Sequence, residues 1–191
     1  SLARASVGDA VSLHIASGPG IDRINADRAQ LETALLNLVL NGRDALQSSD
    51  GAIIIRAKNA PLDDGAAAVL SLSPGRYVTI EVSDNGKGME PEALARATEP
   101  FFTTKDVGKG PGLGLSMVHG FVKQSGGHLH IDSQPDIDTV VCVTLPAIME
   151  SDERQDAPMD MAPHSGLTVL IVEDEPAVLE VSMSRIESLG Y

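Results

Sequence analysis

The amino-acid sequence predicts an α+β fold, a two-layer sandwich in which a mixed sheet packs on helices. Two kinds of pattern carry this prediction. Short runs alternate apolar and polar residues, which is typical of half-buried strands, and two longer segments repeat apolar residues at helical spacing. In chain order the expected elements are a strand, a helix, two strands, a short helix, a glycine-rich loop, a helix and two strands.

The first strand and the first helix are marked by local signals. Apolar and polar residues alternate on either side of Leu13, and the turn 18–20, Gly-Pro-Gly, ends this strand. Asp27 is spaced from Gln30 as an N-cap residue is from its N3 partner, so a helix is expected to begin there. The apolar stripe of this helix faces the core and consists of Leu31, Ala34, Leu35, Leu38, Ala45 and Leu46.

The other elements follow from the same patterns. Strands are expected at 52–58, 76–82, 128–133 and 139–145, and helices at 91–98 and after the glycine-rich loop. Residues 59–75 have a weak internal pattern and are expected to form a long hairpin connection, to which we assign no function.

Composition indicates a globular protein and argues against several classes of function. With 42% hydrophobic residues among 191, the chain can bury a core for one full domain and part of another. A formal net charge of -13 argues against nucleic-acid binding and against direct contact with an anionic membrane. Cys142 is the only cysteine, which fits a reducing cytoplasm. No apolar run approaches the roughly 18 residues of a membrane span, and the start without methionine suggests a piece of a longer protein.

A glycine-rich loop that enters a helix is the clearest sign of a phosphate site. Gly108, Gly110, Gly112 and Gly114 alternate with other residues and lead directly into Leu115. Such a loop presents backbone N–H groups and the positive end of a helix dipole to an anion. The alternative is a flexible surface loop, since a glycine-rich pattern alone is a weak signal.

Two further groups of polar residues follow or border apolar elements. Asn37 and Asn41 are one helical turn apart beside the apolar stripe, where their oxygens could bind Mg²⁺ or simply be solvated. Asp84 follows a predicted strand and precedes Gly86 and Gly88. This arrangement is either an ordinary turn or a loop that holds one acid against the exocyclic amine of a base such as adenine.

Four separate segments occur in one order: LLNLVLNGRDA (35–45), DNGKGM (84–89), EPFFTTK (99–105) and GKGPGLGLSMVHG (108–120). Together they resemble the N, G1, F and G2 boxes of the catalytic ATP-binding domain of sensor histidine kinases, within the wider GHKL ATPase group. The resemblance covers roughly residues 5–146 and implies a sandwich of the GHKL, or Bergerat, type.

The resemblance implies a role for each matching residue. Asn41 would bind Mg²⁺, Asn37 would act with it in catalysis, and Arg43 and Asp44 would lie near the phosphates of ATP. Asp84 would recognise the adenine amine. The other implied nucleotide-binding residues are Gly86, Gly88 and Met89 of the G1 box, Phe102, Thr103, Thr104 and Lys105 of the F box, and Gly110, Gly112, Leu113, Gly114 and Leu115 of the lid and the following helix.

The activity implied by the resemblance is transfer of the γ-phosphoryl group of Mg²⁺-ATP to a histidine. That histidine would lie on an upstream helical hairpin domain that also dimerises the full-length protein, because none of the five histidines here has the acidic, helical context of an acceptor. Hydrolytic relatives usually carry a glutamate where Asn37 stands, and an amide cannot act as that base. Two alternatives stay open: a GHKL-type ATPase or chaperone, and a non-catalytic interaction module.

The C-terminal segment resembles the beginning of a response-regulator receiver domain, which implies a hybrid histidine kinase. Residues 1–146 would then form the catalytic ATP-binding domain, 147–166 a linker and 167–191 a receiver fragment. Glu173 and Asp174 would be the acidic Mg²⁺ pair of an intact receiver. The implied location is cytoplasmic, whether or not the parent protein is anchored in a membrane.

Two positions depart from the family pattern. Pro111 stands where the family usually has threonine or serine, so the phosphate loop loses one N–H group and we expect a stiffer lid. Residues 136–139, Asp-Ile-Asp-Thr, replace the common glycine-containing turn before the last strand. We expect this second change to affect the geometry of the turn alone.

Overall fold

The structure is a computed structural model that describes residues 11–47, 50–105, 112–148 and 183. The chain divides into two compact units, Ser1–Met149 and Glu150–Tyr191. Met183 is the one described residue of the second unit. The expected receiver strand with Glu173 and Asp174, most of the expected linker, and Gly110 and Pro111 of the glycine-rich loop all lie outside the described residues.

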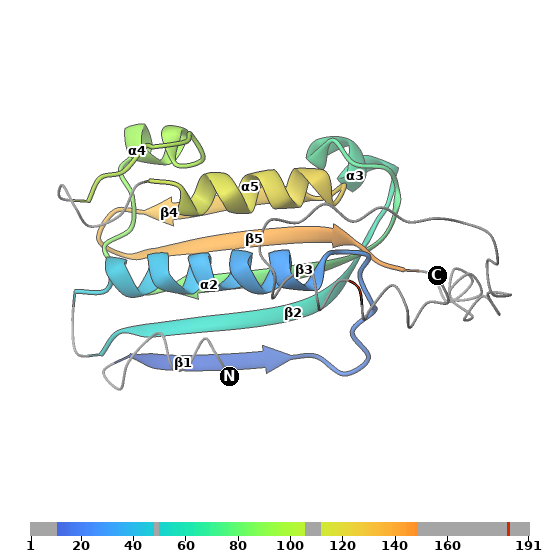
Figure 1. The fold of residues 1–191 in the computed structure, drawn as a ribbon, viewed down its shortest axis with the longest axis horizontal. Coiled ribbons are helices and arrows are strands. Elements are labelled where there is room, and N and C mark those ends of the chain that lie inside the picture. The colour runs from blue at the N-terminus through green and yellow to red at the C-terminus, as the bar shows by residue number, and fades with distance from the viewer. Residues whose placement is uncertain (1–10, 48–49, 106–111, 149–182, 184–191) are drawn as a thin grey trace, which may run out of the picture. The chain divides into compact units, whose positions relative to one another are not determined.

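The first unit contains a five-stranded mixed sheet (Figure 1). Its strands are β1 (Ser12–Ser17), β2 (Ala52–Leu62), β3 (Gly75–Asp84), β4 (His128–Gln134) and β5 (Asp138–Pro146). They are arranged in the order β1-β2-β3-β5-β4, with β1 parallel to β2 and every other neighbouring pair antiparallel. The central strand β3 ends at Asp84, so the sheet delivers this acid to its edge.

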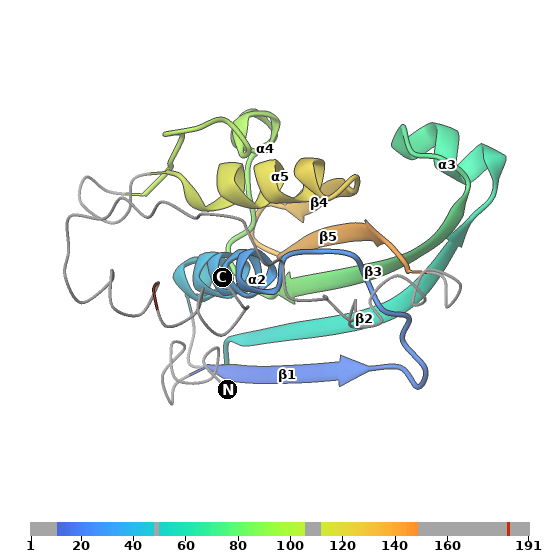
Figure 2. The ribbon, with the colours of Figure 1, turned by 45° about the vertical axis from the view of Figure 1, so that its right-hand side comes forward.

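Two helices cover one face of this sheet. Figures 1 and 2 both show α2 (Arg28–Ala45) and α5 (Gly114–Gln124) side by side on that face. Two shorter helices, α3 (Asp64–Leu70) and α4 (Pro91–Arg96), lie at opposite ends of α5. The predicted α+β sandwich with a mixed sheet is therefore confirmed.

The core lies between α2, α5 and the sheet. Its buried members are Ala34, Leu38, Val39, Ile53, Ile55, Val78, Ile80, Val82, Val118, Phe121, Val122, Val141, Val143 and Leu145. Full burial of one such side chain stabilises the fold by roughly 1.5–3 kcal/mol. The start of α2 is as predicted, since the side chain of Asp27 accepts a hydrogen bond from the N–H group of Gln30 at 2.8 Å. The apolar residues of α2 pack in this core, and their spacing determines the face on which its asparagines lie.

The connection between β2 and β3 differs from the expectation. Strand β2 continues to Leu62, and α3 follows at Asp64–Leu70 where sequence patterns indicated only a loop. Asp63 caps α3 by accepting from the N–H group of Ala66 at 2.8 Å, and Ser71 ends it with a left-handed φ of 56°. This helix is too short for a 3.6-residue period to show in its sequence, so its cap was the one available signal.

Two described residues beyond position 146, the expected end of the domain, also pair with the first unit. Ala147 pairs with Ile24, and the N–H group of Ile148 donates to the carbonyl of Arg23 at 2.7 Å. Among the helices in the described part of the chain, none has both the length and the apolar character needed to cross a membrane.

Candidate functional site

A cavity of about 320 Å³ lies where the C-terminal half of α2, the end of β3, residues 102–105 and the start of α5 meet. It brings together residues that sequence motifs placed in four separate boxes. The motif residues that line it are Asn37, Asn41, Arg43, Asp44, Asp84, Gly88, Met89, Phe102, Thr103, Thr104, Lys105, Gly112, Leu113, Gly114 and Leu115. Gly86 lies behind this wall, against the end of α2.

The two carboxamides of α2 line this cavity from successive helical turns. Asn41 also lies against the start of α5, where a Cβ added to Gly114 would come within 3.2 Å of Nδ2 of Asn41. Oδ1 of Asn41 lies 3.4 Å from Nζ of Lys105, so this oxygen already faces a cation. An uncharged oxygen in this position fits the ligand preference of Mg²⁺. The described residues contain no cluster of three or more His, Cys, Asp or Glu side chains that could hold a metal by itself.

Asp44 is the centre of a small group of charges beside Asn41. Arg43 donates to Oδ1 of Asp44 from Nη2 at 2.8 Å and from Nε at 3.1 Å, and Lys105 donates to Oδ2 at 2.7 Å. Burial alone would raise the pKa of Asp44, but hydrogen bonds from Lys105 and Arg43 bring that pKa below its ordinary value. Two cations and one ionised acid leave one positive charge in excess, which suits an anionic ligand.

Asp84 presents a carboxylate to the other part of the cavity. Burial raises the pKa of Asp84 to about 6, although the N–H group of Gly86 donates to Oδ1 at 3.0 Å and opposes the rise; the charge of Asp138 adds to it. Helix α2 comes close enough at Gly42 that an added Cβ would lie 3.3 Å from Oδ2 of Asp84. A perturbed, partly buried carboxylate in a cavity is suited to accept hydrogen bonds from a ligand amine.

The loop that follows Asp84 is tied to the end of α2 through its backbone. The N–H group of Lys87 donates to the carbonyl of Ala45 at 3.0 Å. A Cβ on Gly86 would lie 2.7 Å from that same carbonyl oxygen, so a larger residue would push the loop away. Gly86 therefore allows the backbone of this loop to pack against the last turn of α2.

The same loop is held from the other side by the turn between β4 and β5. The N–H group of Asp136 donates to the carbonyl of Lys87 at 2.7 Å. Gly88 has a φ of 60° and packs so closely on the carbonyl of Gln134 that no side chain would fit. From the sequence we expected residues 136–139 to affect the geometry of their own turn alone. The structure shows that this turn also supports the loop that follows Asp84.

A hydroxyl group links this turn to the loop. Oγ of Ser133 accepts from the N–H group of Met89 at 2.9 Å and donates to the carbonyl of Asp138 at 2.9 Å. It also lies 2.9 Å from Oγ1 of Thr139, which is buried in the cavity wall. The loop thus has partners on α2, on β4 and in the β4–β5 turn.

Residues 99–105, here called the phenylalanine segment, form a third side of the cavity through Phe102 and the three residues after it. The guanidinium of Arg96 lies 4.4 Å above the ring centre of Phe102, a cation–π geometry. Phe101 is 74% exposed and has a φ of 68°. Its N–H group donates to the carbonyl of Gly112 at 3.0 Å, and a Cβ on Gly112 would lie 2.6 Å from the backbone of Phe101. The segment therefore contacts Gly112, two residues before α5 begins.

Helix α5 begins at the cavity without a side-chain cap from Leu113. Gly114 and Leu115 of its first turn line the cavity. The assignment of roles from the sequence left out several wall residues, some of them inside the motif segments and most of them apolar: Leu38, Leu40, Gly42, Ala45, Val82, Lys87, Ala93, Ala97, Thr139 and Val141. Val82, Thr139 and Val141 could have been found from strand alternation, which places them on the covered face with the core.

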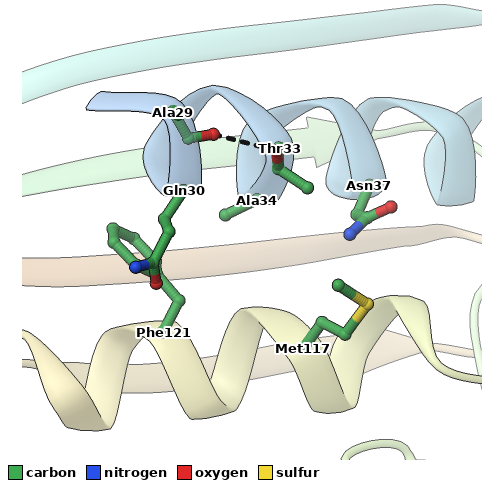
Figure 3. Close-up of a pocket in the computed structure, with 7 residues that line it drawn as sticks. All are labelled: Ala29, Gln30, Thr33, Ala34, Asn37, Met117 and Phe121. Carbon is green, nitrogen blue, oxygen red and sulfur yellow. Dashed lines mark hydrogen bonds between the residues drawn. The ribbon is translucent and has the colours of Figure 1, made fainter. Parts of the chain in front are cut away.

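A second, mainly apolar hollow of about 290 Å³ lies between α2 and α5. Figure 3 shows Met117 and Phe121 of α5 reaching toward α2, with Gln30, Ala34 and Asn37 facing them. Ala29 and Thr33 complete the lining, and none of these side chains titrates near neutral pH. Asn37 lines both hollows, whereas the charged and backbone groups suited to binding surround the first one.

Comparison with known families identifies the family to which the fold belongs. The family model described as "Histidine kinase-, DNA gyrase B-, and HSP90-like ATPase" matches residues 26–148, which contain every element from α2 to β5. The chain belongs to this family. As a histidine kinase-like ATPase domain, it carries the four motif segments around one cavity, and the predicted GHKL resemblance is confirmed for this part of the chain.

Individual relatives agree with this family assignment. The domain and its flanking residues are 39% identical over 197 residues to the sensor kinase CckA of Brucella abortus (strain 2308), covering 97% of this chain and 20% of CckA. The chain therefore spans about a fifth of that relative's length. Among solved structures, the mycobacterial sensor histidine kinase MprB has a TM-score of 0.57 at 23% identity, covering 76% of this chain and 87% of that one.

A further solved structure aligns with the whole chain. Full-length ShkA, crystallised in complex with AMPPNP, has a TM-score of 0.59 at 25% identity and covers 100% of this chain and 35% of ShkA. The histidine kinase-like ATPase fold is thus shared with proteins of the two-component sensor class.

Proposed function

We propose that this chain binds Mg²⁺-ATP in the 320 Å³ cavity and, within a longer sensor kinase, positions the γ-phosphoryl group for transfer to a histidine. The observation that carries the proposal is the meeting of Asn41, Asp84 and the start of α5 around one cavity. Each group suits a different part of ATP, and the related ShkA was crystallised with the ATP analogue AMPPNP.

Different residues of the cavity suit different parts of the nucleotide. Asp84 accepts a hydrogen bond from the adenine amine, while Val82 and Val141 supply apolar wall for the base. Lys105 and the first turn of α5 face the phosphates, where an ammonium and backbone N–H groups stabilise negative charge. These residues bind and orient the nucleotide, which is the main task of a protein in phosphoryl transfer.

Asn41 is the residue that would hold Mg²⁺, through Oδ1. When bound, the metal supplies charge neutralisation on the phosphate oxygens. Asn37 lies one turn earlier on the same wall, and its amide cannot take a proton from water. We therefore propose phosphoryl transfer as the activity. Hydrolysis of ATP without transfer to a histidine would contradict this proposal.

The remaining organisation is proposed from the sequence. Residues 1–146 would be the catalytic domain, 147–166 a linker and 167–191 the start of a receiver with Glu173 and Asp174 as its acidic pair. The match to CckA over 97% of this chain supports continuity with a sensor kinase beyond residue 148. An upstream helical hairpin domain would carry the acceptor histidine and dimerise the cytoplasmic part of the parent protein.

Calorimetric titration with ATP, with and without Mg²⁺, tests the nucleotide site. Asp84→Ala is expected to weaken binding roughly 100-fold, because it removes a charge-assisted hydrogen bond in a partly buried wall. Asn41→Ala is expected to weaken Mg²⁺-ATP about tenfold and to affect metal-free ATP less. Asp132→Ala and Asn25→Ala remove the same groups from exposed positions and should bind like wild type.

Labelled ATP distinguishes transfer from hydrolysis. When the chain is mixed with a helical hairpin domain that carries an acceptor histidine, acid-labile phosphohistidine is expected. Release of free phosphate without phosphohistidine would favour the ATPase alternative instead. If the wild-type protein bound no nucleotide, the cavity would not be an ATP site.

A further inference from the structure

Lys105 contacts two side chains of the cavity, Asp44 and Asn41, in addition to facing the proposed phosphate site. Its Nζ lies 2.7 Å from Oδ2 of Asp44 and 3.4 Å from Oδ1 of Asn41, the oxygen proposed to hold Mg²⁺. The ammonium group of Lys105 thus already contacts the oxygen that would bind the metal. A divalent cation and an ammonium at such close range repel each other, and a partly buried cavity screens them less than water does. Metal binding at Asn41 therefore requires Lys105 to move.

Asp44 can release Lys105 without losing its other partner. Arg43 donates twice to Oδ1 of Asp44, at 2.8 and 3.1 Å, whereas Lys105 uses Oδ2. Departure of Lys105 therefore leaves the carboxylate with one guanidinium and two hydrogen bonds. It also moves the excess positive charge of the group away from Asp44 and into the cavity.

The geometry allows this movement through the side chain of Lys105 alone. The side chains of Lys105 and Asp44 are each 30% exposed, and ion pairs with that much solvent contact are weak. The N–H group of Lys105 donates to Oγ1 of Thr103 at 3.1 Å, which holds the backbone while the four-carbon stem rotates. The polyphosphate would enter the same cavity.

We propose that Lys105 is an exchangeable counter-ion. It pairs with Asp44 and Asn41 before nucleotide binds, and it transfers to the polyphosphate when nucleotide enters, which frees Asn41 for the metal. This inference rests on the proposed function, because it requires ATP in the cavity. It also changes the role of Asp44, which competes with the nucleotide for Lys105 and does not itself contact the phosphates.

Competition predicts opposite effects for the two partners. Lys105→Met should weaken metal-free ATP roughly tenfold, because one ammonium–phosphate contact is lost. Asp44→Asn should tighten it several-fold, on the order of three to ten times, because Lys105 becomes available without breaking an ion pair. Adenosine, which has no phosphate, should bind both variants as it binds wild type.

A double-mutant cycle on the full chain separates exchange from general electrostatics. Asp44→Asn removes a negative charge and so favours phosphate binding whether or not Lys105 is present. The additional gain from the release of Lys105 is absent when Lys105 has been replaced by methionine. Lys87 provides the matched control, since it lines the same cavity, while the ion-pair partners of Asp44 among the described residues are Arg43 and Lys105. The cycle of Asp44→Asn with Lys105→Met should show at least threefold coupling in ATP affinity, whereas the cycle with Lys87→Met should be additive to within about twofold.

A nucleotide-free readout checks the starting state. Lys105→Met should shift the NMR signal of the Asn41 side-chain amide in the absence of ATP, and Lys87→Met should leave it unchanged. Thermal unfolding of each variant without ligand verifies that it is folded.

The outcomes distinguish this inference from the proposed function. If wild type binds neither ATP nor adenosine, both fail. If wild type binds ATP but the Asp44 and Lys105 cycle is additive, or if Asp44→Asn weakens binding, exchange is wrong and the ATP site remains. If the two substitutions couple only in unfolding free energy, the ion pair is structural and exchange is again wrong.

Discussion

The two sides of the cavity are built in different ways. On the Asp84 side, the loop is held by backbone hydrogen bonds to Ala45 and Asp136 and by the close approach of Gly88 to Gln134. On the Lys105 side, the groups are side chains that meet in partly exposed ion pairs. One side is fixed by the packing of the sheet and α2, while the other can change partners without disturbing the fold.

This difference matches the ligand that we propose. An adenine ring has one shape and one pattern of hydrogen bonds, so a wall that does not move can select it. A polyphosphate with its metal changes charge during phosphoryl transfer, and mobile cations can follow that change. The two sides should therefore respond differently to substitution, and four measurements test this.

Gly88→Ala should produce the largest loss of stability. The new Cβ would collide with the carbonyl of Gln134 at a φ of 60°, so the free energy of unfolding should fall by about 2–4 kcal/mol. Gly120→Ala is the matched control, because among the described residues an added Cβ meets nothing within 4 Å apart from its own helix backbone, and alanine favours helix. That variant should gain up to about 1 kcal/mol. Urea unfolding measures both, and an equal loss in the two would show that the loop is not tightly held.

Asp84→Asn should remove a pH dependence of stability. The folded pKa of Asp84 is about 6 against an ordinary value of 3.8. The folded protein therefore binds this proton more tightly, and the resulting stabilisation is complete below pH 3.8 and is lost as pH rises through about 6. Because Asp84 keeps some contact with solvent, we expect a loss of no more than about 1–2 kcal/mol.

Unfolding in urea at a series of pH values measures this effect. The wild type should lose stability relative to Asp84→Asn between about pH 4 and pH 6.5. Parallel profiles for the two proteins would mean that burial does not penalise the charge of Asp84.

Ser133→Ala should loosen the loop by a smaller amount. It leaves the N–H group of Met89 without its partner at 2.9 Å, and we expect a loss of about 1 kcal/mol in unfolding free energy. Ser83→Ala is the control on β3, where the hydroxyl makes a long contact of 3.5 Å to the carbonyl of Ile54. Faster hydrogen exchange at Met89 in Ser133→Ala alone would place the effect in the loop, whereas equal exchange in both variants would argue against it.

Arg96→Ala should have the smallest effect. Loss of the cation–π contact with Phe102 at 4.4 Å should cost about 0.5–1 kcal/mol, since Arg96 is more than half exposed. Arg28→Ala removes a more exposed i,i+4 pair at the start of α2, outside the residues that line the cavity, and serves as the control. A loss above about 2 kcal/mol would mean that the phenylalanine segment is held as firmly as the Asp84 loop.

Local signals in the sequence were enough to predict most of the fold. Periodicity placed α2, and the cap at Asp27 was confirmed at its first residue. Apolar patterns predicted all five strands, although β2 continues to Leu62 where an end at residue 58 was expected. Motif order then predicted that distant residues such as Asn41 and Asp84 would meet, and the structure places both in one cavity.

The features that escaped prediction depend on contacts between segments. No pattern near residue 136 indicates that its N–H group will reach Lys87, because that contact exists only after β5 pairs with β3. The pairing of Lys105 with Asp44 likewise joins residues from separate boxes. The short helix α3 was missed for a different reason, since seven residues carry too little periodicity to see.

The order of the strands has a consequence for how this domain is made. The central strand β3 pairs with β5, so its second edge stays open until residues 138–146 have left the ribosome. Asp84 is opposite Thr139 in that pairing, and the turn before Thr139 supports the loop after Asp84. The cavity therefore cannot assemble while synthesis is still in progress on its last strand. A nascent chain should therefore bind nucleotide only after the whole domain has been synthesised. A chain that ends before residue 138 should bind no nucleotide.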